Sequence, residues 1–106
     1  MMLNKGKYNG IQVLAPRTVE LMTSGQLDFM FNGMDNFGLG FDITSEKSAA
    51  RSPRNAGSFS WGGYFGTTYW ADPKAKLIGL IMTQQSPNSH GDLATKVEQL
   101  MYQSVK

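Results

Sequence analysis

The alternation of apolar and polar positions predicts three successive strands in the second half of the chain. Residues 58–61 alternate serine with large aromatic residues, and residues 67–71 are rich in β-branched and aromatic side chains. A glycine-rich loop joins them, and such loops commonly close hairpins. Turn chemistry at Asp72-Pro73 then leads into residues 76–83, which are apolar nearly throughout and predict a strand covered on both faces. The pattern indicates an antiparallel meander over residues 57–84.

Residues 37–45 predict a further strand, because the chain alternates there as well. Its large apolar side chains would share one face: Phe37, Leu39, Phe41 and Ile43. Upstream, Pro16 suits the first position of a helix that continues through residues 17–24 and ends at Gly25. Residues 1–6 are interpreted as the remnant of a helix whose body lies outside this sequence, and the polar residues 46–56 as a surface loop.

The last helix is predicted over residues 89–105. Ser89 followed by Asp92 has the spacing of a capping box. Apolar residues then recur at helical spacing: Leu93, Val97, Leu100, Met101 and Val105. Lys96, Glu98 and Gln99 are expected to face away from the sheet. The predicted fold is therefore α+β, with antiparallel strands near 37–45, 57–62, 67–72 and 76–84 and the helix 89–105 packed on one face.

Composition restricts the classes of function. The 106 residues form one domain or part of one, and 41% hydrophobic with 17% charged residues indicates a globular chain. Basic residues are scattered, the nearest thing to a cluster being Arg51-Ser-Pro-Arg54, so we expect no nucleic-acid partner. The absence of cysteine and the single histidine argue against thiolate or multi-histidine sites, and we expect no metal or cofactor. No apolar run reaches the roughly 20 residues of a membrane helix.

Several segments together resemble the C-terminal part of the β-lactamase-like serine hydrolases. They are the aromatic-Ser-Trp61-Gly62-Gly63 segment, the loop with Gly66-Thr67, Asp72-Pro73, a hydrophobic strand ending in Thr-Gln, and the upstream segments 14–22 and 37–41. This superfamily includes class C β-lactamases, penicillin-binding proteins and related esterases. Trp61-Gly62-Gly63 falls where the family has its third active-site motif, which is Lys-Thr-Gly in many members. The resemblance implies that residues 1–106 are the C-terminal segment of one β-lactamase-like (transpeptidase-like) domain, without an internal boundary.

The resemblance also implies roles for particular residues. Trp61, Gly62 and Gly63 would line the substrate site, and the backbone N–H of Tyr64 would contribute to the oxyanion hole. Trp61 carries no charge to pair with a substrate carboxylate, which favours neutral esters or amides as substrates. No serine is followed three residues later by lysine, and no tyrosine is followed two residues later by asparagine. The nucleophile is thus expected outside this sequence, and the 106-residue chain alone is expected to be inactive.

Two simpler interpretations remain open. Trp61 and Phe59 are equally consistent with core aromatics on one strand face, and residues 62–66 with nothing more than a hairpin turn. The whole chain is then a non-catalytic binding or assembly module that keeps the sheet and the helix. In the family the last strand pairs with an N-terminal strand that is absent here. We therefore expect residues 77–83 to associate with a second copy or with another polypeptide. The compartment is unknown, although full-length relatives are often periplasmic or extracytoplasmic.

Overall fold

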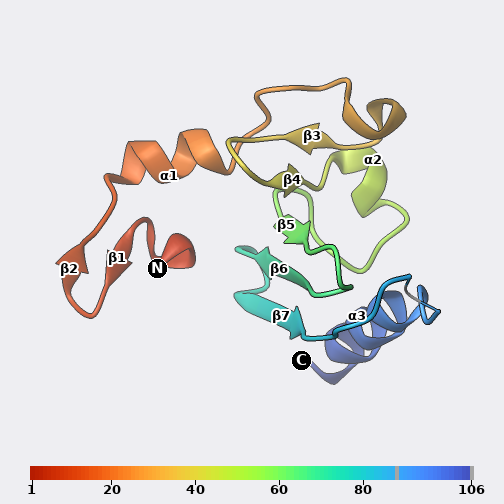
Figure 1. Cartoon of the computed structure of the whole chain (residues 1–106). Helices are drawn as coiled ribbons and strands as arrows, with labels where there is room; N and C mark the ends of the chain where they lie inside the picture. Colours follow the sequence, from red (N-terminus) through yellow and green to blue (C-terminus); the bar gives the residue numbers. More distant parts are fainter. Residues whose placement is uncertain (88, 106) are drawn as a thin grey trace.

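The chain begins with an N-terminal segment, residues 1–22, and continues through an antiparallel sheet to a C-terminal helix that packs on that sheet (Figure 1). The computed structural model describes residues 1–87 and 89–105. The described elements are, in order, η1 (Met2–Asn4), β1 (Lys7–Tyr8), β2 (Ile11–Gln12), α1 (Pro16–Met22), η2 (Met30–Gly33), β3 (Asn36–Phe37), β4 (Asp42–Ile43), α2 (Glu46–Ala49), β5 (Phe59–Gly62), β6 (Thr68–Asp72), β7 (Leu77–Ile81) and α3 (Leu93–Ser104).

The predicted α+β fold with an antiparallel meander is confirmed. Strands β3 to β7 form a sheet in sequence order, and each neighbouring pair is antiparallel. The β5–β6 ladder runs from Phe59 opposite Ala71 to Gly62 opposite Thr68. Strand β7 pairs only with β6 among the described residues, so it forms an edge of the sheet.

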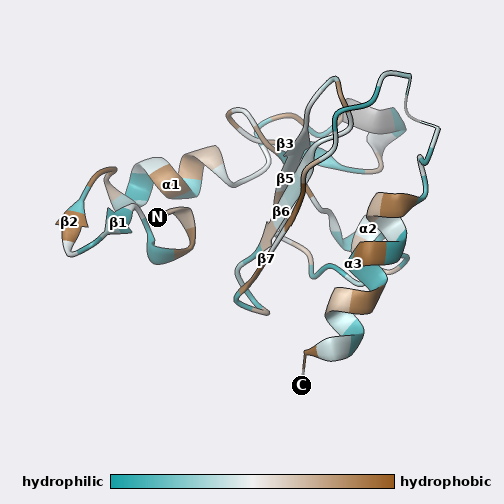
Figure 2. Cartoon of the chain, turned by 60° about the horizontal axis from the view of Figure 1, so that its bottom comes forward, coloured by the Kyte–Doolittle hydropathy of each residue, from teal (hydrophilic) through white to brown (hydrophobic). Residues whose placement is uncertain are grey.

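The two faces of the sheet have different surroundings, as the nearly edge-on view in Figure 2 shows. Ile43, Phe59 and Ala71 are register partners and form the core of one face, where Met2, Leu3 and Phe41 pack against them. The other face carries the fully buried Trp70 and is covered by α3. On that face Gly79 lies directly under the indole, since a Cβ there would come within 2.1 Å of the Trp70 ring.

The strand predicted over residues 37–45 is in fact two short strands, β3 and β4, that form a hairpin. Residues 38–41 leave the ladder, with Gly38 N–H donating to the Phe41 carbonyl at 2.8 Å and Gly40 at φ +92°. Gly38 also lies against the end of α1, where a Cβ would be 2.1 Å from the Met22 carbonyl oxygen. Leu39 N–H donates to that same oxygen at 3.0 Å. The prediction was wrong here because contact with α1, a tertiary feature, interrupts the local alternation.

The C-terminal helix begins later than predicted and presents a different face. Helix α3 starts at Leu93, its N-cap Asp92 makes no side-chain cap bond, and the Ser89 hydroxyl instead accepts from the Gln85 amide at 3.0 Å. Glu98, expected to face away, is buried, whereas Leu100, expected to pack, is 65% exposed. Helix α3 therefore packs through a stripe that includes a carboxylate, because that carboxylate has a partner on the neighbouring loop.

Local chemistry accounts for the β1–β2 hairpin and for the start of α1, of which only α1 was predicted above. Asn9 and Gly10 have φ of 48° and 78° at the turn between β1 and β2, as a tight two-residue hairpin loop requires. Pro16 occupies the first turn of α1. The segment 46–56, predicted to be a loop, begins with the short helix α2, whose N-cap Ser45 hydroxyl accepts from the Ser48 N–H.

A buried carboxylate joins three parts of the fold. Asp72, at the end of β6, is fully buried and accepts five hydrogen bonds. The donors are the backbone and side-chain amides of Asn55, the backbone N–H groups of Lys74 and Ala75, and the hydroxyl of Tyr102 at 2.7 Å. Asp72 therefore ties the loop before β5 and the β6–β7 turn to helix α3.

Candidate active site

The connection between β5 and β6 forms a tight tip. Gly63 N–H donates to the Thr67 carbonyl at 2.7 Å, and Gly66 N–H donates back to the Gly63 carbonyl at 3.1 Å. Gly66 has φ +89°, which favours glycine at that turn position. Tyr64 is 84% exposed, and within the described part of the chain its backbone N–H has no hydrogen-bond partner. An N–H donor is thus available at the point where the ladder has ended.

Trp61 lies beside this tip rather than in the core. Its side chain is 44% exposed, and its ring meets Phe37 edge to face at 5.3 Å between centroids. Phe59, two residues earlier on the same face, is buried. The core interpretation therefore holds for Phe59 and fails for Trp61, whose indole remains accessible next to the tip.

Gly62 and Gly63 are not required by packing within the described chain. A Cβ on Gly62 would meet the Thr67 carbonyl oxygen at 3.4 Å, and one on Gly63 would meet Thr67 at 3.7 Å. Both distances are ordinary contacts, and neither residue has the positive φ that excludes other side chains. Both residues are exposed, so another molecule can approach their backbone closely.

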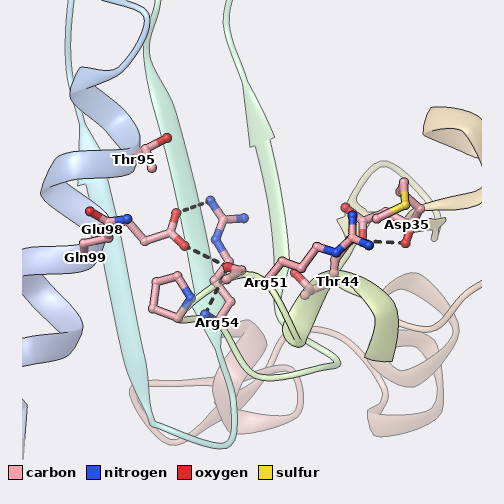
Figure 3. A pocket seen from close by; sticks show the side chains of 11 residues that line it. Asp35, Thr44, Arg51, Arg54, Thr95, Glu98 and Gln99 are labelled. Carbon is pink, nitrogen blue, oxygen red and sulfur yellow. Dashed lines mark hydrogen bonds and ion pairs between the residues drawn. The ribbon is translucent and has the colours of Figure 1, made fainter.

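A cavity of about 330 Å³ lies on the opposite face of the sheet, against α3 (Figure 3). Arg54 and Glu98 pair across it at 2.7 Å, with side chains 19% and 10% exposed. The Ser52 hydroxyl donates to Glu98 at 3.2 Å, and the Arg54 guanidinium lies 5.3 Å from the centre of the Trp70 ring. These charges satisfy one another, so they anchor the 51–54 loop to the helix.

Sequence reasoning missed this anchor, although a signal for it exists. The sequence shows Arg54 only as part of a weak basic cluster and predicts that Glu98 faces away from the sheet. Glu98 is four positions after Ala94 and three before Met101, so it lies on the same stripe of the helix as these less exposed residues. A charged residue on such a stripe indicates a buried ion pair.

Three groups on the helix-covered face have shifted pKa values. Burial, with a smaller contribution from Asp35, raises the pKa of Asp42 to about 6 despite the nearby Arg54, and its Oδ1 has no partner among the described residues. Burial also raises the pKa of Asp72, but the hydrogen bonds it accepts outweigh burial, so its pKa lies below 3.8. Burial and the Asp72 carboxylate raise the pKa of Tyr102. None of the three lies at the β5–β6 tip.

Neither a metal cluster nor a membrane-spanning helix is found in the described part of the chain. Residues 1–87 and 89–105 contain no group of three histidine, aspartate or glutamate side chains placed to hold a metal ion. The described helices are too short or too polar to cross a bilayer.

Comparison with known proteins identifies relatives for nearly the whole chain. The family model described as Beta-lactamase matches residues 1–101. The uncharacterized protein MT1414 and Protein Rv1367c, from two strains of Mycobacterium tuberculosis, are each 34% identical over 110 residues, covering 92% of this chain and 27% of the relative. This chain thus spans about a quarter of the length of these relatives.

Solved structures agree with this match. Unliganded simvastatin synthase LovD from Aspergillus terreus superposes with a TM-score of 0.77 at 26% identity, over 95% of this chain and 30% of that one. EstCE1, described as a hydrolase with promiscuous acyltransferase activity, superposes with a TM-score of 0.75 at 23% identity, over 95% of this chain and 27% of that one. The likeness to EstCE1 concerns the fold.

Proposed function

The chain belongs to the β-lactamase family, a serine hydrolase superfamily, and we propose that it supplies one wall of an acyl-transfer site. In this proposal the Tyr64 N–H is one donor of the oxyanion hole. Trp61, Gly62 and Gly63 line the substrate channel beside it. The observation that carries the proposal is the Tyr64 N–H at the tip, which has no hydrogen-bond partner among the described residues and lies next to two exposed glycines.

The proposed chemistry follows from where charge develops. Attack on an ester or amide carbonyl places negative charge on its oxygen, and a preorganised N–H donor stabilises that charge. Loss of one such donor costs about 10²–10³ in kcat. The bonds at Gly63 and Gly66 hold the tip in one conformation before substrate arrives, so little reorganisation is needed.

The proposed substrate is a neutral ester or amide. An indole at position 61 offers one N–H donor and an apolar surface, with no positive charge for a carboxylate. The edge-to-face contact with Phe37 orients this indole. EstCE1, whose fold is similar, is described as a hydrolase with promiscuous acyltransferase activity, and this is acyl chemistry of the proposed kind.

The nucleophile in this proposal lies outside residues 1–106, because these residues contain no Ser-x-x-Lys. The chain by itself is therefore expected to leave p-nitrophenyl esters and nitrocefin intact. Turnover is expected only after this chain is joined to the nucleophile-bearing segment of the domain.

Substitution of Gly63 tests the assignment in the reconstituted enzyme. Gly63→Val would place a branched side chain where substrate must approach, so turnover should fall at least 100-fold while the thermal midpoint of unfolding changes little. Gly91→Val is the matched control, because a Cβ at Gly91 meets nothing within 4 Å and the residue is remote in sequence from the tip. Full activity of the Gly63→Val enzyme would exclude a substrate channel along this strand.

A second candidate function is a non-catalytic assembly module, which the edge strand favours. Among the described residues β7 has a partner on one side only. Ile78, Leu80 and Met82 are 60%, 59% and 79% exposed, an apolar surface that soluble monomers rarely leave uncovered. In this alternative residues 77–83 pair with a second copy or another polypeptide, and no ester is hydrolysed even after the domain is completed. The reconstitution assay therefore separates the two functions.

A further inference from the structure

The β5–β6 tip is held from outside its own hairpin, by residues 83–85, the segment that follows β7. Phe65, in the tip, directs its carbonyl oxygen toward the segment that follows β7. The Thr83 hydroxyl donates to that oxygen at 3.0 Å, and the Gln85 backbone N–H donates to it at 3.0 Å. One carbonyl in the tip thus accepts two hydrogen bonds from residues nearly 20 positions away.

A third bond connects the same two segments. The Thr67 hydroxyl, at the start of the return strand, donates to the Thr83 carbonyl at 3.0 Å. The Thr83 carbonyl therefore accepts a hydrogen bond from Thr67, on one side of the hairpin, while the Thr83 hydroxyl donates one to Phe65 in the tip. The bond between Thr67 and Thr83 is partly buried, whereas the bond from the Thr83 hydroxyl to the Phe65 carbonyl is exposed.

We infer that the Thr83 hydroxyl is a positioning group for the Tyr64 N–H, an inference that rests on the proposed function. Within the hairpin, the tip is fixed at Gly63 and Gly66. The Phe65 carbonyl belongs to the same peptide unit as the Gly66 N–H, two units after the Tyr64 N–H, so the bonds from Thr83 and Gln85 fix the outer side of the same turn. With both sides held, the direction of the Tyr64 N–H is set by the segment after β7 as well as by β5 and β6.

The alternative explanation for this contact is general stability, and the geometry distinguishes the two. The Phe65 side chain is 50% exposed and Tyr64 is 84% exposed, so the tip contributes little buried apolar surface to the fold. Three side-chain and backbone bonds that order an exposed turn are better explained by a need for precise backbone placement there.

The kinetic test compares Thr83→Val with Thr83→Ser in the reconstituted enzyme. Valine keeps the shape and removes the hydroxyl, whereas serine keeps the hydroxyl. Because an oxyanion donor acts in the transition state, Thr83→Val should lower kcat for a p-nitrophenyl ester about tenfold with KM within about twofold. Thr83→Ser should restore kcat to within about twofold. Thr95→Val, on α3, is the matched control and should leave both constants unchanged.

An independent test uses the 106-residue chain itself. In Thr83→Val, hydrogen exchange at the Gly66 and Gln85 amides should accelerate about tenfold, and serine should reverse this. Unchanged exchange in Thr83→Val would overturn the inference, and so would accelerated exchange with an unchanged kcat. If the unsubstituted reconstituted enzyme hydrolyses no ester, the proposed function fails and the catalytic consequence fails with it. The exchange rates then still report whether Thr83 orders the tip.

Discussion

Replacement of Asp72 should destabilise the chain more than replacement of any exposed polar residue, because this carboxylate satisfies five donors. Two of them, the N–H groups of Lys74 and Ala75, belong to a surface turn, where water can replace the carboxylate. The other three are the two amides of Asn55 and the hydroxyl of Tyr102. These lie in the partly buried junction between the loop, the sheet and α3, so Asp72→Ala leaves them without an acceptor.

The expected magnitude follows from those three donors. Each buried donor left unsatisfied costs about 1–3 kcal/mol. Taking the lower half of that range, Asp72→Ala should cost about 3–6 kcal/mol, a large share of the roughly 5–15 kcal/mol that holds a typical domain folded. Tyr102→Phe removes one donor and leaves Asp72 four hydrogen bonds, so it should cost only about 1–2 kcal/mol.

Urea unfolding at neutral pH, followed by tryptophan fluorescence and circular dichroism, measures both variants. With a slope of about 1.5 kcal/mol/M, Asp72→Ala should lower the midpoint by about 2–4 M and Tyr102→Phe by about 1 M. The chain should be measured at several concentrations, because association would make the midpoint concentration-dependent. An Asp72→Ala midpoint within 0.3 M (roughly 0.5 kcal/mol) of the unsubstituted chain would refute the argument.

The pH dependence gives a second check on the same residue. The pKa of Asp72 is lower in the folded chain than its usual 3.8. The unfolded chain therefore binds the proton first, and the stability that Asp72 contributes is present above pH 3.8 and is lost as pH falls through the folded pKa. Asp72→Ala should lack this acid-induced loss, and an identical loss in both proteins would assign it to other carboxyl groups.

Three further outcomes are expected. Burial raises the pKa of Asp42 to about 6, so between pH 3.8 and 6 the folded chain keeps a proton on Asp42 that the unfolded chain has lost. The contribution of Asp42 to stability is therefore lost as pH rises through that range. Thermal unfolding of Asp42→Asn should lack this dependence of stability on pH, and an unchanged dependence would contradict the argument. Glu98→Ala leaves the Arg54 guanidinium without its counter-charge and should lower the free energy of unfolding in urea by about 3–5 kcal/mol. Gln99→Ala, at an exposed position, should lower it by less than about 0.5 kcal/mol, and equal costs would argue against a buried pair. Leu80→Lys should weaken self-association in sedimentation velocity more than Leu100→Lys, whose position is similarly exposed; a chain that is monomeric at micromolar concentration would rule out association through the β7 edge.

The sequence alone was sufficient for the features that depend on neighbouring residues. The alternation in 58–61 and 67–71 predicted β5 and β6, and Asp72-Pro73 predicted the turn to β7. Strand periodicity and turn chemistry act over a few residues, so they can be recognised without knowing what the strands contact. The family resemblance also rested on these short segments, and the match over residues 1–101 agrees with it.

The tertiary structure alone decided the features that depend on distant residues. Contact with the end of α1 interrupts the alternation at Gly38, and Arg54 draws Glu98 into the face of α3 that covers the sheet. The site depends on the same kind of contact, because Thr83 holds the tip that carries Tyr64. In each case two segments far apart in sequence exchange a hydrogen bond or a steric contact, and the pattern within one segment does not identify its partner in the other.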